Sequence, residues 1–220
     1  SIDSAGSFNN DSGFSIVSYT GTGSNGTLKH GLNSVPKMII VKDRDTAQAW
    51  TVYHASLGAT KELRLNATSA AGTSSTRWQD TTPTSTVFSI GTEAAVNGSG
   101  VDFIAYCFSD VQGYSKFGSY TGNGNADGTD NNGTFVYTGF KPAWLMVKRT
   151  DSTSDWSMYD IKREAANPQY EFDLQLKAND SAAEGSNGQL GMYSNGFKLR
   201  STDTFLNASG GTYIYMAFAE

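Results

Sequence analysis

The sequence has little charge, very few cysteines, histidines and prolines, and no long apolar run. Charged residues make up 17% of the 220 residues, and 16 basic against 21 acidic residues give a net charge of −5. Because nucleic-acid affinity rests mainly on clustered Lys and Arg, this composition argues against a nucleic-acid partner. No apolar run approaches the roughly 20 residues that a membrane-spanning helix requires. We therefore expect neither nucleic-acid binding nor membrane insertion.

Only one cysteine and two histidines are present, which narrows the available chemistry. Cys107 cannot form a disulfide within the chain, and its apolar neighbours indicate a small buried side chain. His30 and His54 are not accompanied by the Gly-x-Ser-x-Gly motif of a Ser-His-Asp hydrolase. Paired carboxylates could cleave a glycoside, but the candidates lie at predicted turns, where Asp is favoured by its own backbone hydrogen bonds. We expect no enzymatic activity and, apart from one candidate Ca²⁺ loop, no cofactor.

One stretch of the sequence occurs twice in the chain. Pro36 to Tyr53 matches Pro142 to Tyr159 with a constant shift of 106 residues and without a gap. Each copy reads as an apolar run, a polar turn and an alternating run, which is the pattern of two strands joined by a short loop. The match extends in both directions, so copy one covers about residues 14–110 and copy two about 117–220, with a connector at 111–116.

The remaining composition predicts an all-β fold. Glycine occurs 24 times, and Ser, Thr and Asn separate short apolar runs, as in strands joined by turns. Copy one alone predicts about seven strands, a number typical of a β-sandwich. We expect two tandem, internally duplicated antiparallel β-sandwiches, jelly-roll-like and packed rigidly together because the connector is short. One larger sandwich, with the copies related by a pseudo-twofold axis, also fits the pattern.

Alternation within the repeated stretch assigns side chains to faces of the predicted strands. It places Trp50 and Tyr53 on opposite faces. We expect Trp50 and its counterpart Trp156 to be the central core side chains of their copies. Lys42 and Lys148 end their strands, so we expect both to point to water.

Residues 1–13 lie outside both copies and are rich in small polar residues. This composition predicts a linker or a flexible tail. The alternative is an arm that packs on a neighbouring subunit through Ile2 and Phe8, because a solvated tail would not need these apolar side chains.

The two copies differ most at residues 73–83, where Arg77, Trp78, Gln79 and Asp80 stand together in a polar loop. An exposed indole flanked by hydrogen-bonding groups is a common way to stack on a sugar ring. The loop is therefore a candidate glycan-binding site. The alternative is a Trp side chain that folds back and covers the end of the sandwich.

The loop from Asn123 to Gly133 places oxygen-bearing side chains at alternate positions. Asp127, Asp130 and Asn131 are ligands of the type that Ca²⁺ accepts. Since the loop lacks the closing Glu of an EF-hand, a solvated turn and a structural Ca²⁺ site are both open interpretations.

Several strings along the chain resemble one known family. They are Phe14-Ser-Ile-Val-Ser-Tyr-Thr-Gly, Val35-Pro-Lys-Met-Ile-Ile-Val-Lys, Trp50-Thr-Val-Tyr-His, Ile104-Ala-Tyr-Cys-Phe-Ser, Gly113-Tyr-Ser-Lys-Phe-Gly-Ser-Tyr-Thr-Gly-Asn-Gly and Tyr213-Ile-Tyr-Met-Ala-Phe-Ala-Glu. Together they are similar to a duplicated domain of tail-fibre-like virion proteins from marine bacteriophages and cyanophages. The resemblance covers nearly the whole chain after residue 13.

This resemblance implies a component of the virion surface or of an appendage, with other virion proteins as partners. It also implies a homotrimer, the usual state of phage fibres, and it supplies no catalytic residues. We expect a non-enzymatic appendage domain that contacts a host-surface glycan or polysaccharide. The alternative is a purely structural subunit, such as a capsid decoration, tail or filament component, assembled through protein–protein contacts.

Overall fold

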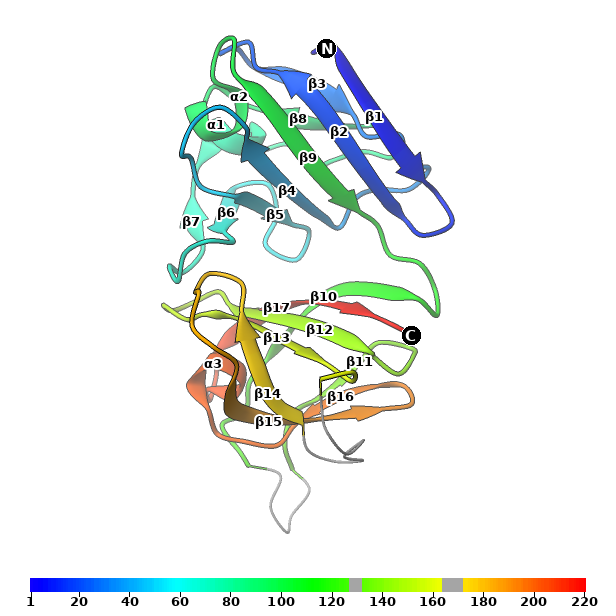
Figure 1. The fold of residues 1–220 in the computed structure, drawn as a ribbon, viewed down its shortest axis with the longest axis vertical. Coiled ribbons are helices and arrows are strands. Elements are labelled where there is room, and N and C mark those ends of the chain that lie inside the picture. Colours follow the sequence, from blue (N-terminus) through cyan, green and yellow to red (C-terminus); the bar gives the residue numbers. More distant parts are fainter. Residues whose placement is uncertain (127–131, 164–171) are drawn as a thin grey trace. The chain divides into compact units, whose positions relative to one another are not determined.

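Short antiparallel strands make up most of the regular secondary structure in the described chain (Figure 1). The structure is a computed structural model, which describes residues 1–126, 132–163 and 172–220. The strand pairs in these ranges are antiparallel, and the helices there are single turns of four residues. The all-β fold predicted from the sequence is therefore confirmed. No helix in the described ranges is long and apolar enough to cross a membrane.

The chain folds into two compact units. Unit 1 contains residues 1–67 and 71–111, and unit 2 contains residues 68–70 and 112–220. The elements of unit 1 are β1 (Ser4–Asn9), β2 (Phe14–Thr20), β3 (Gly26–Lys29), β4 (Met38–Asp43), β5 (Thr51–His54), β6 (Lys61–Arg64), β7 (Gly72–Thr73), α1 (Ser75–Trp78), β8 (Val87–Ile90), α2 (Ala94–Asn97) and β9 (Asp102–Phe108). The elements of unit 2 are β10 (Ser115–Thr121), β11 (Phe135–Tyr137), β12 (Trp144–Arg149), β13 (Trp156–Asp160), β14 (Phe172–Lys177), β15 (Gly185–Tyr193), β16 (Gly196–Leu199), α3 (Thr204–Asn207) and β17 (Thr212–Phe218).

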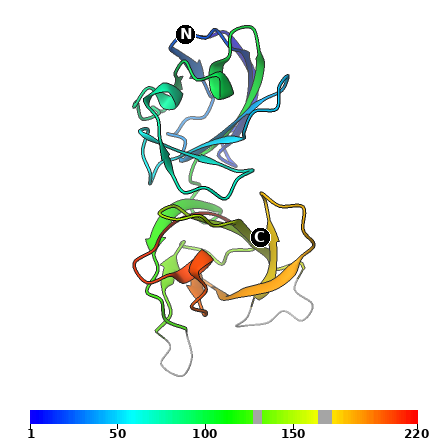
Figure 2. The same cartoon turned by 90° about the vertical axis from the view of Figure 1, so that its left-hand side faces the viewer.

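Unit 1 is built on a seven-stranded sheet with the order β1-β2-β9-β4-β5-β6-β7, while β3 and β8 form a separate pair. The helices α1 and α2 lie close together beside this sheet (Figure 2). Side chains from both strand groups and both helices meet in one buried core, with Leu28 of β3, Val41 of β4 and Val96 of α2 among its members. Cys107 of β9 also belongs to this core, as predicted, and burial raises the pKa of its thiol to about 12.

Unit 2 contains an eight-stranded sheet with the order β10-β17-β12-β13-β14-β15-β16-β11. This sheet folds over, so that β15 and β16 lie across from β12 and β17 (Figure 1). The core lies between the two halves of the sheet, and it includes Val147 of β12, Tyr215 of β17, Leu190 of β15 and Phe197 of β16. One face of β16 and its neighbours is therefore buried, and the other faces outward.

The strands that carry the repeated sequence occur in the same order in the two units. The order β2-β9-β4-β5-β6 of unit 1 corresponds to β10-β17-β12-β13-β14 of unit 2. The pairing register also corresponds, because Val41 lies opposite Thr51 and Val147 lies opposite Ser157. The two sheets also differ at the edge beside β2 and β10. β1 covers the outer side of β2, whereas β10, the counterpart of β2, ends the described sheet of unit 2.

Residues 1–13 do not form a linker or a flexible tail. β1 pairs with β2 along its whole length. Ile2 packs against the core of unit 1, and its backbone N–H donates to the Thr27 carbonyl at 2.8 Å. This anchoring holds Ile2 within its own unit, and a contact of Ile2 with a neighbouring subunit stays a prediction. Phe8 on β1 is 59% exposed, and its role in assembly stays a prediction.

Trp50 is not a core side chain. It is half-buried and stacks on Tyr106, with ring centroids 6.3 Å apart. The opposite face of β5 is the one that turns to the core, so Tyr53 is buried there instead. In unit 2 Tyr159, rather than Trp156, belongs to the core cluster, although Trp156 is only 1% exposed. The face assigned to the core was therefore wrong for Trp50, whereas the predicted burial of Trp156 is confirmed, although Trp156 lies outside the core cluster of unit 2.

Lys42 and Lys148 do not point to water either. The Lys42 ammonium donates to the carbonyl oxygens of Asp43 at 2.7 Å and Gln48 at 3.1 Å. The Lys148 ammonium donates to the Ser154 carbonyl at 2.8 Å, and burial lowers the pKa of Lys148 to about 8. Each lysine thus satisfies backbone carbonyl groups of the loop that follows its strand, which would otherwise lack partners.

Candidate functional site

Two exposed aromatic side chains lie on one short edge strand of unit 2. Phe135 and Tyr137 on β11 are 45% and 67% exposed, while Val136 between them is buried in the core. Because successive side chains of a strand point to opposite faces, the two rings share the outer face. Full burial of a phenylalanine contributes about 1.5–3 kcal/mol, which these rings largely forgo. The outer face of β11 is therefore a candidate binding surface.

The neighbouring strands β16 and β15 extend this face. Two rows of residues cross the three strands: Tyr137, Gly196 and Tyr193 in one row, and Phe135, Lys198 and Gly191 in the next. We call these six residues the aromatic platform. The opposite face of the same strands points into the core of unit 2.

The two glycines let the rings lie down on the sheet. A Cβ atom on Gly196 would lie 2.9 Å from the Phe135 Cζ and 2.1 Å from the Val136 carbonyl oxygen. A Cβ atom on Gly191 would lie 2.6 Å from the Tyr193 Cε2. The rings of Phe135 and Tyr193 meet at 66° with centroids 6.3 Å apart. Side chains at the glycine positions would push the rings off the strands, so the glycines shape the platform.

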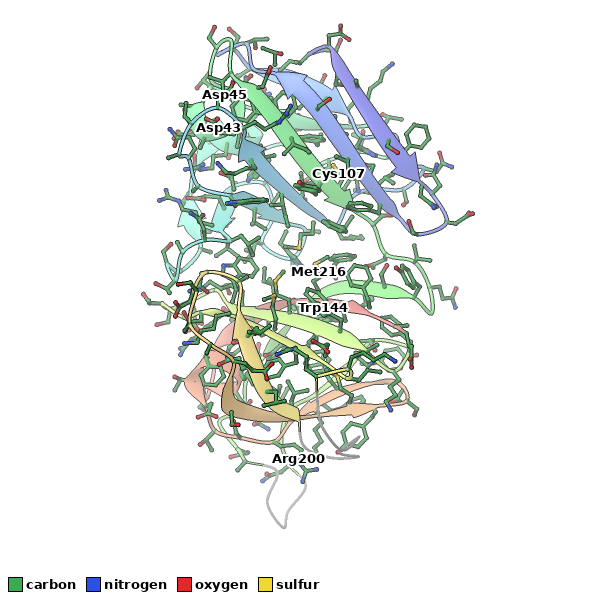
Figure 3. All side chains as sticks on the ribbon, in the orientation of Figure 1. Asp43, Asp45, Cys107, Trp144, Arg200 and Met216 are labelled. Carbon is green, nitrogen blue, oxygen red and sulfur yellow. The ribbon has the colours of Figure 1, made fainter. Side chains whose placement is uncertain are left out.

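Positive charge adjoins these rings. Lys198 stands between Phe135 and Gly191 in its row. Arg200 follows β16, and its Nη1 lies 3.4 Å from the Tyr193 hydroxyl (Figure 3). Lys198 and Arg200 also take part in other interactions within the chain. The platform thus combines apolar ring surface with hydroxyl groups and the Lys198 cation, and Arg200 adjoins it as a second cation.

This arrangement is suited to binding a polar ligand that has apolar C–H faces. Aromatic rings supply stacking surface, and hydroxyl and cationic groups supply directional hydrogen bonds. The six platform residues include no carboxylate, histidine or cysteine, so they offer no acid–base pair and no activated nucleophile. Their chemistry is that of recognition.

A hollow of about 600 Å³ in unit 1 is less suited to this task. Its wall includes Asp3, Arg44 and Asp102. The Asp102 carboxylate accepts a hydrogen bond from the Thr20 hydroxyl at 2.7 Å, and the Asp102 backbone N–H donates to the Asp45 carboxylate at 2.7 Å. The aromatic residues among its described lining are buried, so it offers hydrogen bonds without a stacking surface.

The loop next to this hollow is fixed by a carboxylate. The Asp43 Oδ1 accepts hydrogen bonds from the backbone N–H groups of Asp45 at 2.9 Å and Thr46 at 2.7 Å (Figure 3). Burial alone would raise the pKa of Asp43, but the hydrogen bonds from Thr46 and Asp45 outweigh it and lower that pKa. Asp43 therefore serves the loop rather than a ligand.

The structure places Trp78 in the core of unit 1. Its indole is 2% exposed and meets the Tyr53 ring edge-on, with centroids 5.8 Å apart. The one-turn helix α1 directs the side chain inward. The prediction of an exposed indole that stacks on a sugar is therefore wrong, and the inward-folded alternative is correct.

The neighbours of Trp78 also serve the structure of unit 1. The Arg77 Nη1 donates to the Thr51 hydroxyl at 3.1 Å, and its Nε lies 3.6 Å from the Glu62 carboxylate. The Gln79 amide donates to two backbone carbonyl oxygens at 2.9 and 2.6 Å. Asp80 alone of the predicted glycan set is exposed. These residues do not form a common binding surface.

The predicted Ca²⁺ ligands Asp127, Asp130 and Asn131 lie outside the described residues, so this site stays a prediction. Within the described ranges, no group of three or more His, Cys, Asp or Glu side chains is arranged to hold a metal ion.

Sequence reasoning does not find the aromatic platform. The available signal is the alternation Phe135-Val136-Tyr137, in a strand of three residues. The rest of the platform comes from β15 and β16, far along the chain, and only the pairing of β11 with β16 brings the rows together.

The whole chain, residues 1–220, matches the model of a protein family described as a domain of unknown function (DUF7483). No curated protein and no solved structure matches it. Because that description states no activity, the geometry of the platform is what points to a function.

Proposed function

We propose that this chain, which belongs to the DUF7483 family, is a non-enzymatic binding domain of a phage virion appendage that contacts a host-surface glycan through its aromatic platform. The observation that carries the proposal is the exposure of Phe135 and Tyr137 on one face, beside hydroxyl and cationic groups. The virion location rests on the resemblance of the sequence strings and on the interpretation of the two units as a duplication.

Binding of the full-length chain to a glycan array tests this proposal. Tyr137→Ala and Phe135→Ala should each weaken binding by about two- to tenfold, because each removes one stacking ring. Phe8→Ala is the matched control, since Phe8 is also an exposed phenylalanine on an edge strand. Glycan binding that is the same in both platform variants as in the wild type would refute the proposed site.

A second candidate function is a purely structural virion subunit, and the edge of unit 2 favours it. β10 ends the described sheet of unit 2, although its counterpart β2 is covered by β1. A strand that ends a sheet can pair with a strand from another chain, and Ser119 and Thr121 on β10 are exposed. The partner in this proposal is a second copy of the chain, joined edge to edge at β10.

Light scattering separates this candidate from the first. Ser119→Lys places a charge on β10, which should dissociate copies joined at that edge. Ser7→Lys, at an exposed serine of edge strand β1, is the control. A wild-type mass equal to one chain, with glycan binding intact, would refute the structural candidate.

A further inference from the structure

We infer that the ligand of the aromatic platform is an acidic glycan, one that carries carboxylate or sulfate groups. This inference rests on the proposed function and names the ligand class of the same site. It follows from the position of Lys198 and Arg200 among the rings.

Lys198 occupies the centre of the platform. In its row it lies between Phe135 on β11 and Gly191 on β15. Gly191 has no side chain that could stand between the lysine and a ligand on the rings. A sugar that stacks on Phe135 would therefore bring its ring substituents close to the Lys198 ammonium.

Arg200, two residues after Lys198 and just past the end of β16, supplies a second cation. The Nη1 of Arg200 lies 3.4 Å from the Tyr193 hydroxyl, which places its guanidinium beside a platform ring. A guanidinium binds a planar carboxylate or a sulfate through two N–H groups at once, which a neutral hydroxyl cannot match.

The charges of Lys198 and Arg200 are positive, whereas the net charge of the chain is negative. The chain carries a net charge of −5, yet the three platform strands β11, β15 and β16 contain no Asp or Glu, and the neighbouring β14 contributes one, Asp173. The net negative charge of the chain repels an acidic polymer, but at the aromatic platform the polymer meets two cations beside a stacking surface. A neutral glycan can accept hydrogen bonds from the two cations, but it gains no ionic attraction to offset their desolvation.

The inference does not require that the two cations lack partners. Both side chains engage in further interactions within the chain. An arginine has five N–H donors and a lysine has three, so an additional anionic acceptor can be bound alongside the existing ones.

Affinity electrophoresis of the full chain with three polymers tests the inference. The probes are dextran, dextran sulfate and polygalacturonate, so that one neutral polymer is compared with its sulfated form and with a carboxylated one. We expect binding to at least one acidic polymer and at least tenfold weaker binding to dextran. Binding of dextran sulfate alone assigns a sulfate, and binding of polygalacturonate alone assigns a carboxylate.

Variants that remove one positive charge test whether Lys198 and Arg200 bind the acidic polymer. Lys198→Gln and Arg200→Gln should each weaken binding of the acidic polymer by about tenfold. Lys29→Gln, at an exposed lysine of unit 1, should leave it unchanged. Wild-type binding should also weaken as salt is raised from 50 to 500 mM, a readout that needs no variant, because salt screens exposed charges.

Failure of the acidic-glycan inference can be distinguished from failure of the proposed function. Dextran binding equal to that of the acidic polymers, independent of salt and lost in Tyr137→Ala, would overturn the acidic class and leave the proposed function standing. Absence of binding to all three polymers and to a glycan array would overturn both.

Discussion

Asn97 and Asn207 hold corresponding positions in the two units. Each ends a one-turn helix, α2 or α3, and each side chain is 0% exposed. The Asn97 Oδ1 accepts a hydrogen bond from the backbone N–H of Thr22 at 2.8 Å, and the Asn207 Oδ1 accepts one from Asn123 at 3.0 Å. In both units this asparagine fastens the glycine-containing loop that follows the first strand of the repeated pattern.

Asn97→Ala should lower the free energy of unfolding by about 2–4 kcal/mol. The Asn97 amide also donates to the carbonyl oxygens of Ser24 and Gly91, each at 2.7 Å, so the change leaves three backbone groups without their partner. Urea denaturation followed by circular dichroism measures the loss. Asn33→Ala, at an exposed asparagine, is the control. Equal stability of the two variants would contradict the proposed role of Asn97.

Trp78→Ala should destabilise unit 1 by about 3–5 kcal/mol, as expected when a large buried ring is deleted. Trp50→Ala should cost less, because Trp50 is only half-buried. Thermal unfolding of both variants gives the comparison. If Trp78→Ala abolished glycan binding while its stability stayed at the wild-type value, the core assignment of Trp78 would be wrong.

Arg77→Met should be destabilising, by about 3 kcal/mol, because it removes the buried guanidinium beside Glu62 and leaves that carboxylate with the half-exposed Arg64 alone, at 3.4 Å. Adding Glu62→Gln should recover part of the loss. At the corresponding position of unit 2 the residue is neutral: it is Gln175, whose amide donates to the Ser157 hydroxyl at 2.6 Å. A double-mutant cycle in urea measures the coupling. A double variant that is less stable than Arg77→Met alone would rule out this interpretation.

Stability should fall as the pH drops below about 6.5 because of His30. The His30 Nε2 donates to the Thr84 carbonyl at 3.2 Å and its Nδ1 accepts the Leu32 N–H at 3.1 Å, an arrangement that requires a neutral ring. Burial lowers the pKa of His30 from 6.5, although the bond to Thr84 opposes this. The unfolded chain therefore takes up the proton first, and acid favours unfolding between pH 6.5 and the lower pKa of the folded state.

Urea midpoints at pH 8, 7, 6 and 5.5 measure this effect. The wild-type midpoint should be constant above pH 7 and should decline toward pH 5.5. His30→Gln should decline less over the same range, because glutamine does not titrate. Identical pH profiles for the two proteins would assign the decline to other groups.

Short-range patterns predicted the strands well. On β2, Ser15, Val17 and Tyr19 are buried and alternate with more exposed residues, which is the period of two that the sequence indicates. The alignment of the two copies by sequence alone failed farther along the chain. Aligning Leu63-Arg64-Leu65 with Leu174-Gln175-Leu176 pairs Arg64 with Gln175, whereas the strand register places Arg64 opposite Thr51 and Lys177 opposite Ser157. The register depends on backbone hydrogen bonds between strands, which the sequence does not display.

By itself, the sequence determined the all-β class, the repeated strand pattern and the burial of Cys107, because these follow from composition and from alternation between neighbours. Tertiary structure alone decided which face of each strand turns to the core. Alternation is the same for either choice, so Trp50 was assigned the wrong face. The polar loop around Trp78 left an exposed and an inward-folded indole both open, and the one-turn helix α1 decided for the inward one. The aromatic platform was decided in the same way, since Phe135 and Tyr137 become a binding surface only when β11 pairs with β16 and turns Val136 into the core.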